Sequence, residues 1–221
     1  MKSSRPSKSK DITYVLLKES LEKEDCPTCY LLARTRERWL DSLLYEHVND
    51  SVLRDKIREI GFCTRHIWAM LKYSEEHPIV DGLGISIIVQ DVLGDKLSIM
   101  LKTEIANADW GKKCILCELL DESEKSYSES FAIWFGGDEF QELYRTSPSI
   151  FCMNHLRSLL RELQDKDRKL IMQIHLTKLE KLNRDLKSFI RKFDWTVKEK
   201  PTYEEADAKQ MAIRALKGSE Y

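Results

Sequence analysis

The chain has 221 residues, enough for one large domain or two small ones, and its 36 Lys and Arg nearly balance its 37 Asp and Glu, for a formal net charge of −1. This balance argues against the strongly basic character of a typical nucleic-acid-binding protein. Charged residues make up 33% of the chain and hydrophobic residues 42%, with only 8 Gly and 5 Pro. That composition favours an all-α protein over one rich in strands and turns.

The distribution of apolar residues predicts a protein that does not enter a membrane. The N-terminal residues are basic and polar and lack the apolar run of a secretory signal. The most apolar stretch, 84–101, is interrupted by Asp91, Asp95 and Lys96 and does not resemble a membrane span. We therefore expect a cytoplasmic location, where patterned cysteines indicate metal or redox chemistry more than disulfides.

The first half of the chain predicts a basic, disordered arm over 1–10 and then five helices. Pro27 suits the first position of a helix, where a missing N–H costs nothing. Asn49, Asp50 and Ser51 are natural cap residues, and Gly61 and Pro78 mark further breaks. The expected helices span 11–25, 28–48, 52–60, 62–77 and 80–107.

The second half repeats this order. Gly136-Gly137 and Ser147-Pro148-Ser149 mark its breaks, and a polar connection around Pro201 leads to a last amphipathic helix. Its expected helices span 114–135, 138–145, 151–165, about 166–193 and 202–218. We therefore predict two tandem, related helical bundles, 11–105 and 106–193, followed by a linker and C-terminal helix over 194–221.

All six cysteines follow one duplicated pattern, a Cys-x-x-Cys and a Cys-x-x-His separated by a gap of 33 or 34 residues. Each half contributes one of each pair, and the halves are offset by 88 to 89 residues. The first copy comprises Cys26, Cys29, Cys63 and His66, and the second comprises Cys114, Cys117, Cys152 and His155.

This donor set predicts two zinc sites, each with three cysteines and one histidine. Thiolate and neutral imidazole are the ligands that zinc prefers, and four protein ligands close its tetrahedral shell, as in structural sites. An iron–sulfur cluster is the alternative. Buried, unliganded or redox-sensing thiols are also compatible, whereas disulfides fit poorly because three cysteines per half leave one unpaired. The spacing leaves open whether the pairs combine within or between the copies.

Two other groups of side chains are candidate sites. Glu46, His47 and Asp50 form a polar cluster at the end of a helix and could line a cleft, although helix capping and solvent exposure explain them as well. Four basic residues lie on adjacent faces of the long helix over 166–193 and could follow a phosphate backbone, but a solvated helix face is the favoured interpretation. They are Lys181, Arg184, Lys187 and Arg191.

The motifs Cys-Pro-x-Cys at 26–29, Leu-Leu-Tyr-Glu-x-Val-Asn-Asp at 43–50 and Gly-Phe-Cys-x-x-His at 61–66 resemble those of a family of uncharacterised bacterial and archaeal proteins of unknown function. The similarity extends through both halves to the final helix. The second copy departs from the pattern, because it lacks the counterpart of 43–50 and has Ile150 where the first copy has Gly61. The resemblance implies metal binding and supplies no reaction.

These observations favour a zinc-stabilised helical protein that acts by binding a partner, more often a protein than a nucleic acid, and is not an enzyme. A thiol-based redox or metal sensor is the second hypothesis. An enzyme with a site between the halves that uses Glu46, His47 and Asp50 is the third.

Overall fold

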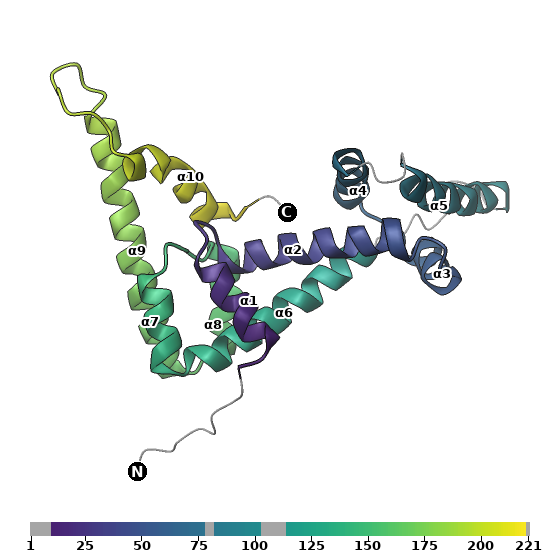
Figure 1. Ribbon diagram of the computed structural model, residues 1–221, viewed down its shortest axis with the longest axis horizontal. Coiled ribbons are helices and arrows are strands. Elements are labelled where there is room, and N and C mark those ends of the chain that lie inside the picture. The colour runs from purple at the N-terminus through teal and green to yellow at the C-terminus, as the bar shows by residue number, and fades with distance from the viewer. Residues whose placement is uncertain (1–9, 78–81, 103–113, 220–221) are drawn as a thin grey trace, which may run out of the picture. The chain divides into compact units, whose positions relative to one another are not determined.

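The computed structural model describes residues 10–77, 82–102 and 114–219, and over these residues it confirms the predicted all-α fold, with no strand (Figure 1). None of the described helices is both long and apolar enough to cross a bilayer. The arm over 1–9 and the end of the helix predicted over 80–107 lie outside the described residues. The elements are α1 (Ile12–Leu21), α2 (Pro27–Asp41), the π-helix η1 (Ser42–Glu46), α3 (Ser51–Ile60), α4 (Thr64–Glu76), α5 (Leu83–Lys102), α6 (Ile115–Phe135), α7 (Asp138–Thr146), α8 (Met153–Glu162), α9 (Asp165–Arg191) and α10 (Tyr203–Lys217).

The chain divides into two compact units that cut across the two sequence copies. Unit 1 comprises Met1–Leu32 and Glu124–Tyr221, and unit 2 comprises Ala33–Ser123. The divisions therefore fall inside α2 and α6. Each unit combines the beginning of one sequence copy with the later part of the other.

Unit 1 has an aromatic core built from α6, α7 and the segment before α8. The ring centroid of Phe131 lies 5.0 Å from those of Phe140 and Phe151 and 5.9 Å from that of Tyr144, at angles of 75°, 85° and 88°. Such edge-to-face pairs are favoured by the aromatic quadrupole and are worth ~0.5–1.5 kcal/mol each beyond their burial. Three cysteines, Cys26, Cys29 and Cys152, pack in the same buried cluster.

The C-terminal helix α10 belongs to unit 1 and packs along α9 (Figure 1). Thr202 and Glu205 form a reciprocal capping box that starts α10. The Glu205 carboxylate also receives two hydrogen bonds of 2.8 Å from Lys192 Nζ, just beyond α9, and both side chains are only about a tenth exposed. These polar contacts fix where α10 begins against α9.

Unit 2 places η1, α3 and α4 around α5. A Cβ at Gly84 would lie 2.2 Å from the Leu44 carbonyl oxygen, so only glycine allows α5 to approach η1 this closely. Two turns further along the same face of α5, Arg54 of α3 donates two hydrogen bonds, of 2.5 and 2.6 Å, to the buried carboxylate of Asp91.

The helix predicted over 28–48 changes character at Ser42. From there it continues as η1, in which the His47 amide donates to the Ser42 carbonyl at 2.9 Å, five residues back. Leu43 and Leu44 are consecutive and yet both are about 1% exposed, a placement that the wider π turn accommodates. Asp50 then caps α3 as predicted, accepting from the amides of Val52 and Leu53.

Candidate metal centres

Every Cys-x-x-Cys and Cys-x-x-His begins at the start of a helix. Cys63 and Cys152 are the N-cap residues of α4 and α8, and Cys26 and Cys114 directly precede α2 and α6. The second ligand of each pair follows three residues later, in the first turn, so both side chains reach one point. The unpaired N–H groups of a helix start favour the negative charge of a thiolate.

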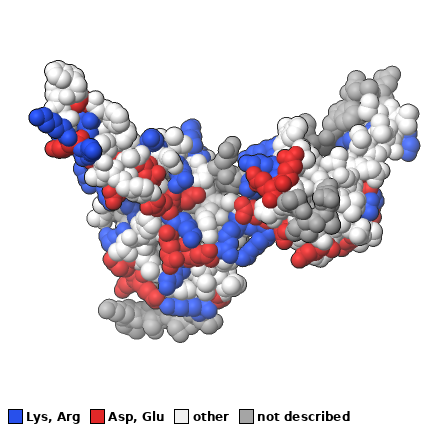
Figure 2. All heavy atoms as spheres, turned by 45° about the horizontal axis from the view of Figure 1, so that its top comes forward, with Lys and Arg blue, Asp and Glu red and all other residues white. Residues whose placement is uncertain are grey.

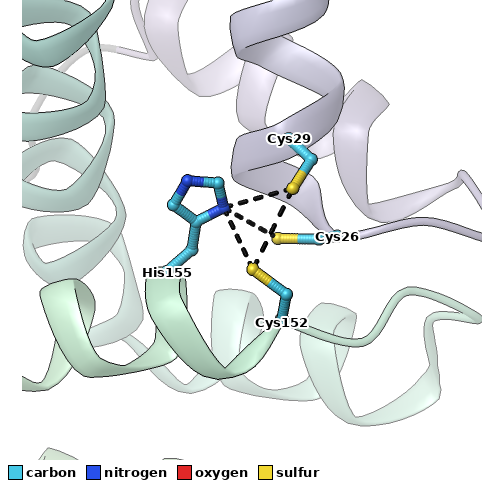
Figure 3. Close-up of side chains that lie close together, drawn as sticks. All are labelled: Cys26, Cys29, Cys152 and His155. Atoms are coloured by element: carbon cyan, nitrogen blue, oxygen red, sulfur yellow. Dashed lines mark hydrogen bonds between the residues drawn. The ribbon is translucent and has the colours of Figure 1, made fainter. Parts of the chain in front are cut away.

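The first cluster, site 1, lies in unit 1 and joins the start of α2 to the start of α8 (Figure 3). His155 Nδ1 faces the three sulfurs, at 3.4 Å from Cys26 Sγ and 3.3 Å from Cys29 Sγ and Cys152 Sγ. The sulfurs of Cys29 and Cys152 are 4.0 Å apart. All four residues are buried, none more than 4% exposed.

The second cluster, site 2, lies in unit 2 and joins the start of α4 to the start of α6. His66 Nδ1 lies 3.5 Å from Cys63 Sγ, 3.2 Å from Cys114 Sγ and 3.3 Å from Cys117 Sγ. The sulfurs of Cys63 and Cys117 are 3.8 Å apart. His66 and Cys114 are buried, whereas Cys63 and Cys117 are only partly buried, so site 2 is the more accessible of the two.

The ligand pairs combine between the sequence copies. The Cys-x-x-Cys of the first copy meets the Cys-x-x-His of the second in site 1, and the remaining two pairs meet in site 2. This arrangement answers the question that the spacing left open. The eight predicted ligand residues form two groups of four, but neither group is made by one copy alone.

The geometry of both clusters fits a single tetrahedral zinc ion. With Zn–S near 2.3 Å and Zn–N near 2.0–2.1 Å, a tetrahedral shell has edges of about 3.8 Å between sulfurs and about 3.6 Å between sulfur and nitrogen. The observed sulfur–sulfur separations of 3.8 and 4.0 Å and sulfur–nitrogen separations of 3.2 to 3.5 Å are close to these edges. They are also far longer than a disulfide bond, and all six cysteines are free.

The two histidines differ in what faces their second ring nitrogen. His155 Nε2 lies 3.8 Å from a carboxylate oxygen of Glu124, whereas His66 Nε2 lies 3.5 Å from Arg65 Nη2. When Nδ1 binds an ion, Nε2 carries the proton, and a carboxylate opposite that proton strengthens the ligand. An arginine cation at the same place has the opposite effect. Neither Glu124 nor Arg65 was predicted, although Arg65 lies inside the Cys-x-x-His motif of site 2.

The pKa values of the two histidines also differ. Burial lowers the pKa of His66 to about 4, and the charges of Arg65 and Arg36 act in the same direction. Burial also opposes the charged form of His155, but hydrogen bonds with Cys152 and Cys29 outweigh it and raise the pKa of His155 to about 10. The two imidazoles therefore begin from different protonation states before any ion binds.

The end of α10 covers site 1. Gly218, the C-cap of α10, has φ +86° and ψ 173°, and a Cβ there would lie 3.0 Å from Cys29 Sγ and 3.4 Å from Cys152 Sγ. Arg214 donates to the Glu24 carbonyl at 2.7 Å, and Ser219 hydrogen-bonds Asp25, so this end of the chain is tied to the loop before Cys26. Sequence reasoning missed Gly218, because a glycine after a helix is common for reasons of capping alone.

The half-buried Lys178 holds the segment that leads into Cys152. Lys178 Nζ donates to the carbonyls of Ser147 and Ser149 at 2.5 and 2.9 Å and lies 4.6 Å from the Tyr144 ring centroid. Burial lowers the pKa of Lys178 to about 8, with Lys181 contributing. Beside it, the Tyr144 hydroxyl and His175 Nδ1 are hydrogen-bonded at 3.2 Å. These groups position the loop before α8.

The candidate cleft residues do not form a cleft. The side chains of Glu46 and His47 are 63% and 53% exposed, and the Asp50 side chain caps α3 while facing solvent. The carboxylates project from a helix end, where capping and hydration are their natural roles. Within unit 2, these three side chains are exposed to solvent and line no enclosed site.

The candidate nucleic-acid residues on α9 are exposed, but acidic side chains lie close to them. Arg191 forms an ion pair of 2.9 Å with Glu199, and Lys181 lines a cavity of about 170 Å³ together with Glu204 and Asp207. Arg184 and Lys187 face solvent. Figure 2 shows Lys and Arg interspersed with Asp and Glu over the visible face, so no continuous basic surface appears there.

Comparison with known proteins places the chain among uncharacterised relatives. It is 25% identical over 213 residues to the uncharacterized 23.9 kDa protein in the xynA 3′ region of Caldicellulosiruptor sp. (strain Rt8B.4), a match that covers 91% of this chain and 99% of that protein. No solved structure matches the chain. One family matches it twice, over residues 9–107 and 96–221, as expected for a duplicated plan. The chain belongs to this family of unknown function, DUF6062.

Proposed function

We propose that the protein binds two zinc ions that stabilise its two helical units, and that it acts by binding another protein. The observation that carries the metal part is the convergence of three sulfurs and one imidazole nitrogen within 4.8 Å at each site. Each site has four protein ligands, which leaves no coordination position for a reactive water. The proposed role of the ions is therefore structural.

The position of the ligands supports this role. Each site links helix starts that lie far apart in the sequence, such as Cys29 and Cys152, which are separated by 123 residues. Structural zinc contributes ~10–16 kcal/mol of apparent binding free energy near neutral pH, which becomes folding free energy when the site forms only in the folded protein. Such a contribution is large compared with the stability of a small helical unit.

The compactness of the sites supports zinc over an iron–sulfur cluster. A cluster distributes its ligands over several iron atoms and needs a wider cage, whereas these donor atoms fit around one ion. Six free cysteines also support the proposed cytoplasmic location, since reducing compartments keep thiols available for metals.

Metal analysis of the purified full-length protein tests this proposal. We expect about two zinc ions per chain by inductively coupled plasma mass spectrometry, and a zinc X-ray absorption spectrum fitted by three sulfurs and one nitrogen. Protein containing iron and sulfide, or zinc with oxygen ligands, would contradict the proposal.

A redox sensor is the second candidate, and the partial exposure of Cys63 and Cys117 favours it. A hydroperoxide would accept two electrons and two protons as its O–O bond breaks, giving water and an alcohol. The two thiols would supply these electrons and form a disulfide across the present 3.8 Å gap, which would release the ion from site 2. Release of one zinc per chain by mild peroxide, reversed by a thiol reductant and added zinc, would support this function. Retention of both ions under the same treatment would exclude it.

A further inference from the structure

Helix α5 turns apolar side chains to solvent and a carboxylate to the interior. Asp91 is buried against Arg54, whereas Leu93, Leu97 and Leu101 are 57%, 50% and 87% exposed. Ile85 and Ile88 of α5 still face the core, so the helix is apolar on a second, exposed side, whereas a usual surface helix has one apolar stripe, toward the core. An exposed apolar surface of this size on a folded chain marks an interaction site.

These exposed leucines, which we call the exposed stripe of α5, border a groove between α4 and α5. The groove has a volume of about 620 Å³, and its apolar walls include Ile67, Trp68 and Leu71 of α4 and Val89 and Leu93 of α5. Trp68 is 64% exposed. The groove lies along the N-terminal half of α5, while the C-terminal half carries a ridge formed by Leu97, Met100 and Leu101.

The exposed positions on one side of α5 are evenly spaced about Leu93, which lies at the middle of the helix. Val89 and Leu97 lie four residues before and after Leu93, and Ser86 and Met100 lie seven residues before and after it. All five positions are exposed on one side of the helix. If a second α5 lies antiparallel with Leu93 next to its own counterpart, the ridge of each helix meets the groove of the other.

We propose that a second copy of this chain binds here, so that α5 pairs with its counterpart in an antiparallel, two-fold dimer. Such an interface is isologous, with each surface contacting the same surface of the partner. A Trp side chain has about 150–250 Å² of surface, and the exposed parts of the apolar residues of α4 and α5 together offer on the order of 700 Å². A standard interface buries about 800 Å² on each partner. The proposal goes beyond metal binding and concerns how unit 2 assembles.

The first test is a substitution at Leu93, where the two-fold axis of the dimer would pass. It uses the zinc-loaded, full-length chain and measures the dimer by sedimentation. We expect the wild type to sediment as a dimer at micromolar concentration. Leu93→Asp, which places two carboxylates next to each other in an apolar contact, should raise the dissociation constant at least about 10-fold. Leu176→Asp is the matched control, since Leu176 is 50% exposed on α9 of unit 1, and it should leave the dimer unchanged. Circular dichroism and zinc content show whether each variant is folded.

A charge pair tests the antiparallel register. Ser86→Glu or Met100→Lys alone should weaken the dimer. The double variant Ser86→Glu/Met100→Lys should restore it toward the wild type, because the carboxylate introduced at position 86 of each copy then lies beside the ammonium group introduced at position 100 of the other. The control Ser86→Lys/Met100→Lys should not recover. A wild-type chain that remains monomeric at 100 μM (about one hundredfold above a typical micromolar dissociation constant), or a Leu176→Asp variant that dissociates as readily as Leu93→Asp, would overturn the proposal.

Discussion

At the scale of single residues, the two sites depend on where each ligand lies in its helix. A sulfur at or next to the N-cap and a second ligand three residues later share one face, and the helix start favours the thiolate charge. The cysteines of site 1 also belong to the hydrophobic core of unit 1. Loss of one ligand there therefore removes both metal affinity and core packing.

Cys29→Ser and Cys117→Ser should each remove one zinc per chain, with different structural effects. Cys29→Ser should reduce the free energy of unfolding of unit 1 by ~3 kcal/mol or more, because three buried ligands remain without an ion. Cys117→Ser should act on unit 2. Amide hydrogen exchange of the two variants, read separately for α7–α9 and α3–α5, measures this difference. Equal loss of protection in both units from either variant would contradict it.

Gly218→Ala should weaken site 1. The backbone of Gly218 lies in a region that side chains other than glycine rarely adopt, at a cost of ~1–3 kcal/mol, and the new methyl group would press on two ligand sulfurs. We expect faster zinc loss to a chelator and a lower melting temperature. Gly94→Ala is the control, since a Cβ there meets only Gln90 Nε2 at 3.8 Å in mid-helix and should stabilise by ~0.5–1 kcal/mol. Similar zinc retention in both variants would exclude the covering role of α10.

The ligands themselves could be predicted from the sequence, but their partners could not. A duplicated Cys-x-x-Cys and Cys-x-x-His identifies eight residues, because no common structural role demands that spacing twice. Both possible pairings satisfy the ligand count equally. Which pairs meet depends on the packing of helices far apart in the chain, as do the contacts of Glu124 and Gly218 with site 1. None of these long-range contacts leaves a local sequence signal.

At the scale of the elements, most helix boundaries follow from local chemistry. Pro27 begins α2, Asp50 caps α3, and the 147–149 segment separates α7 from α8, as predicted. The π-helix η1 was not predicted, because burial of both Leu43 and Leu44 depends on tertiary contacts with α5. The beginning of α10 depends on one polar cluster, in which Glu205 serves both the capping box and Lys192.

The contact between α10 and α9 should weaken in acid. Hydrogen bonds from Lys192, Ser188 and the Thr202 backbone lower the pKa of Glu205 to about 2, from an ordinary value of 4.5. A carboxyl group with a lowered pKa stabilises the folded state above its unfolded pKa, and this contribution is lost as pH falls from 4.5 toward 2. The difference in melting temperature between the wild type and Glu205→Gln should therefore be largest above pH 5 and decrease toward pH 3. A difference that stays constant over this range would contradict the role of the charge.

At the scale of the whole molecule, pairing between the copies makes each unit depend on residues from both copies. Site 1 needs residues from 26–29 and 152–155, so unit 1 cannot close before the second copy is present. Unit 2 needs only residues 63–117 and lies within a continuous stretch of the chain. Its contacts are closer in sequence, which favours earlier formation.

The two sites differ in burial and in the charges beside their histidines, and we therefore expect their zinc ions to leave at different rates. Site 1 is buried, has Glu124 facing His155 and has Gly218 against its sulfurs, whereas site 2 has two partly exposed cysteines and Arg65 facing His66. Groups that contact the ligands of an ion, and not the ion itself, change metal affinity by about 10- to 100-fold. A chromogenic chelator in excess should therefore remove zinc in two phases of about one ion each, with rates at least about 10-fold apart.

Variants assign the two phases to the two sites. Cys117→Ser should abolish the fast phase and Cys29→Ser the slow one, while Glu124→Gln should accelerate only the slow phase, because His155 would lose the negative charge that supports its ring. Arg65→Gln should slow the fast phase by removing the cation beside His66. A single phase of two ions in the wild type, or acceleration of the fast phase by Glu124→Gln, would show that these neighbouring charges do not govern how firmly each site holds its ion.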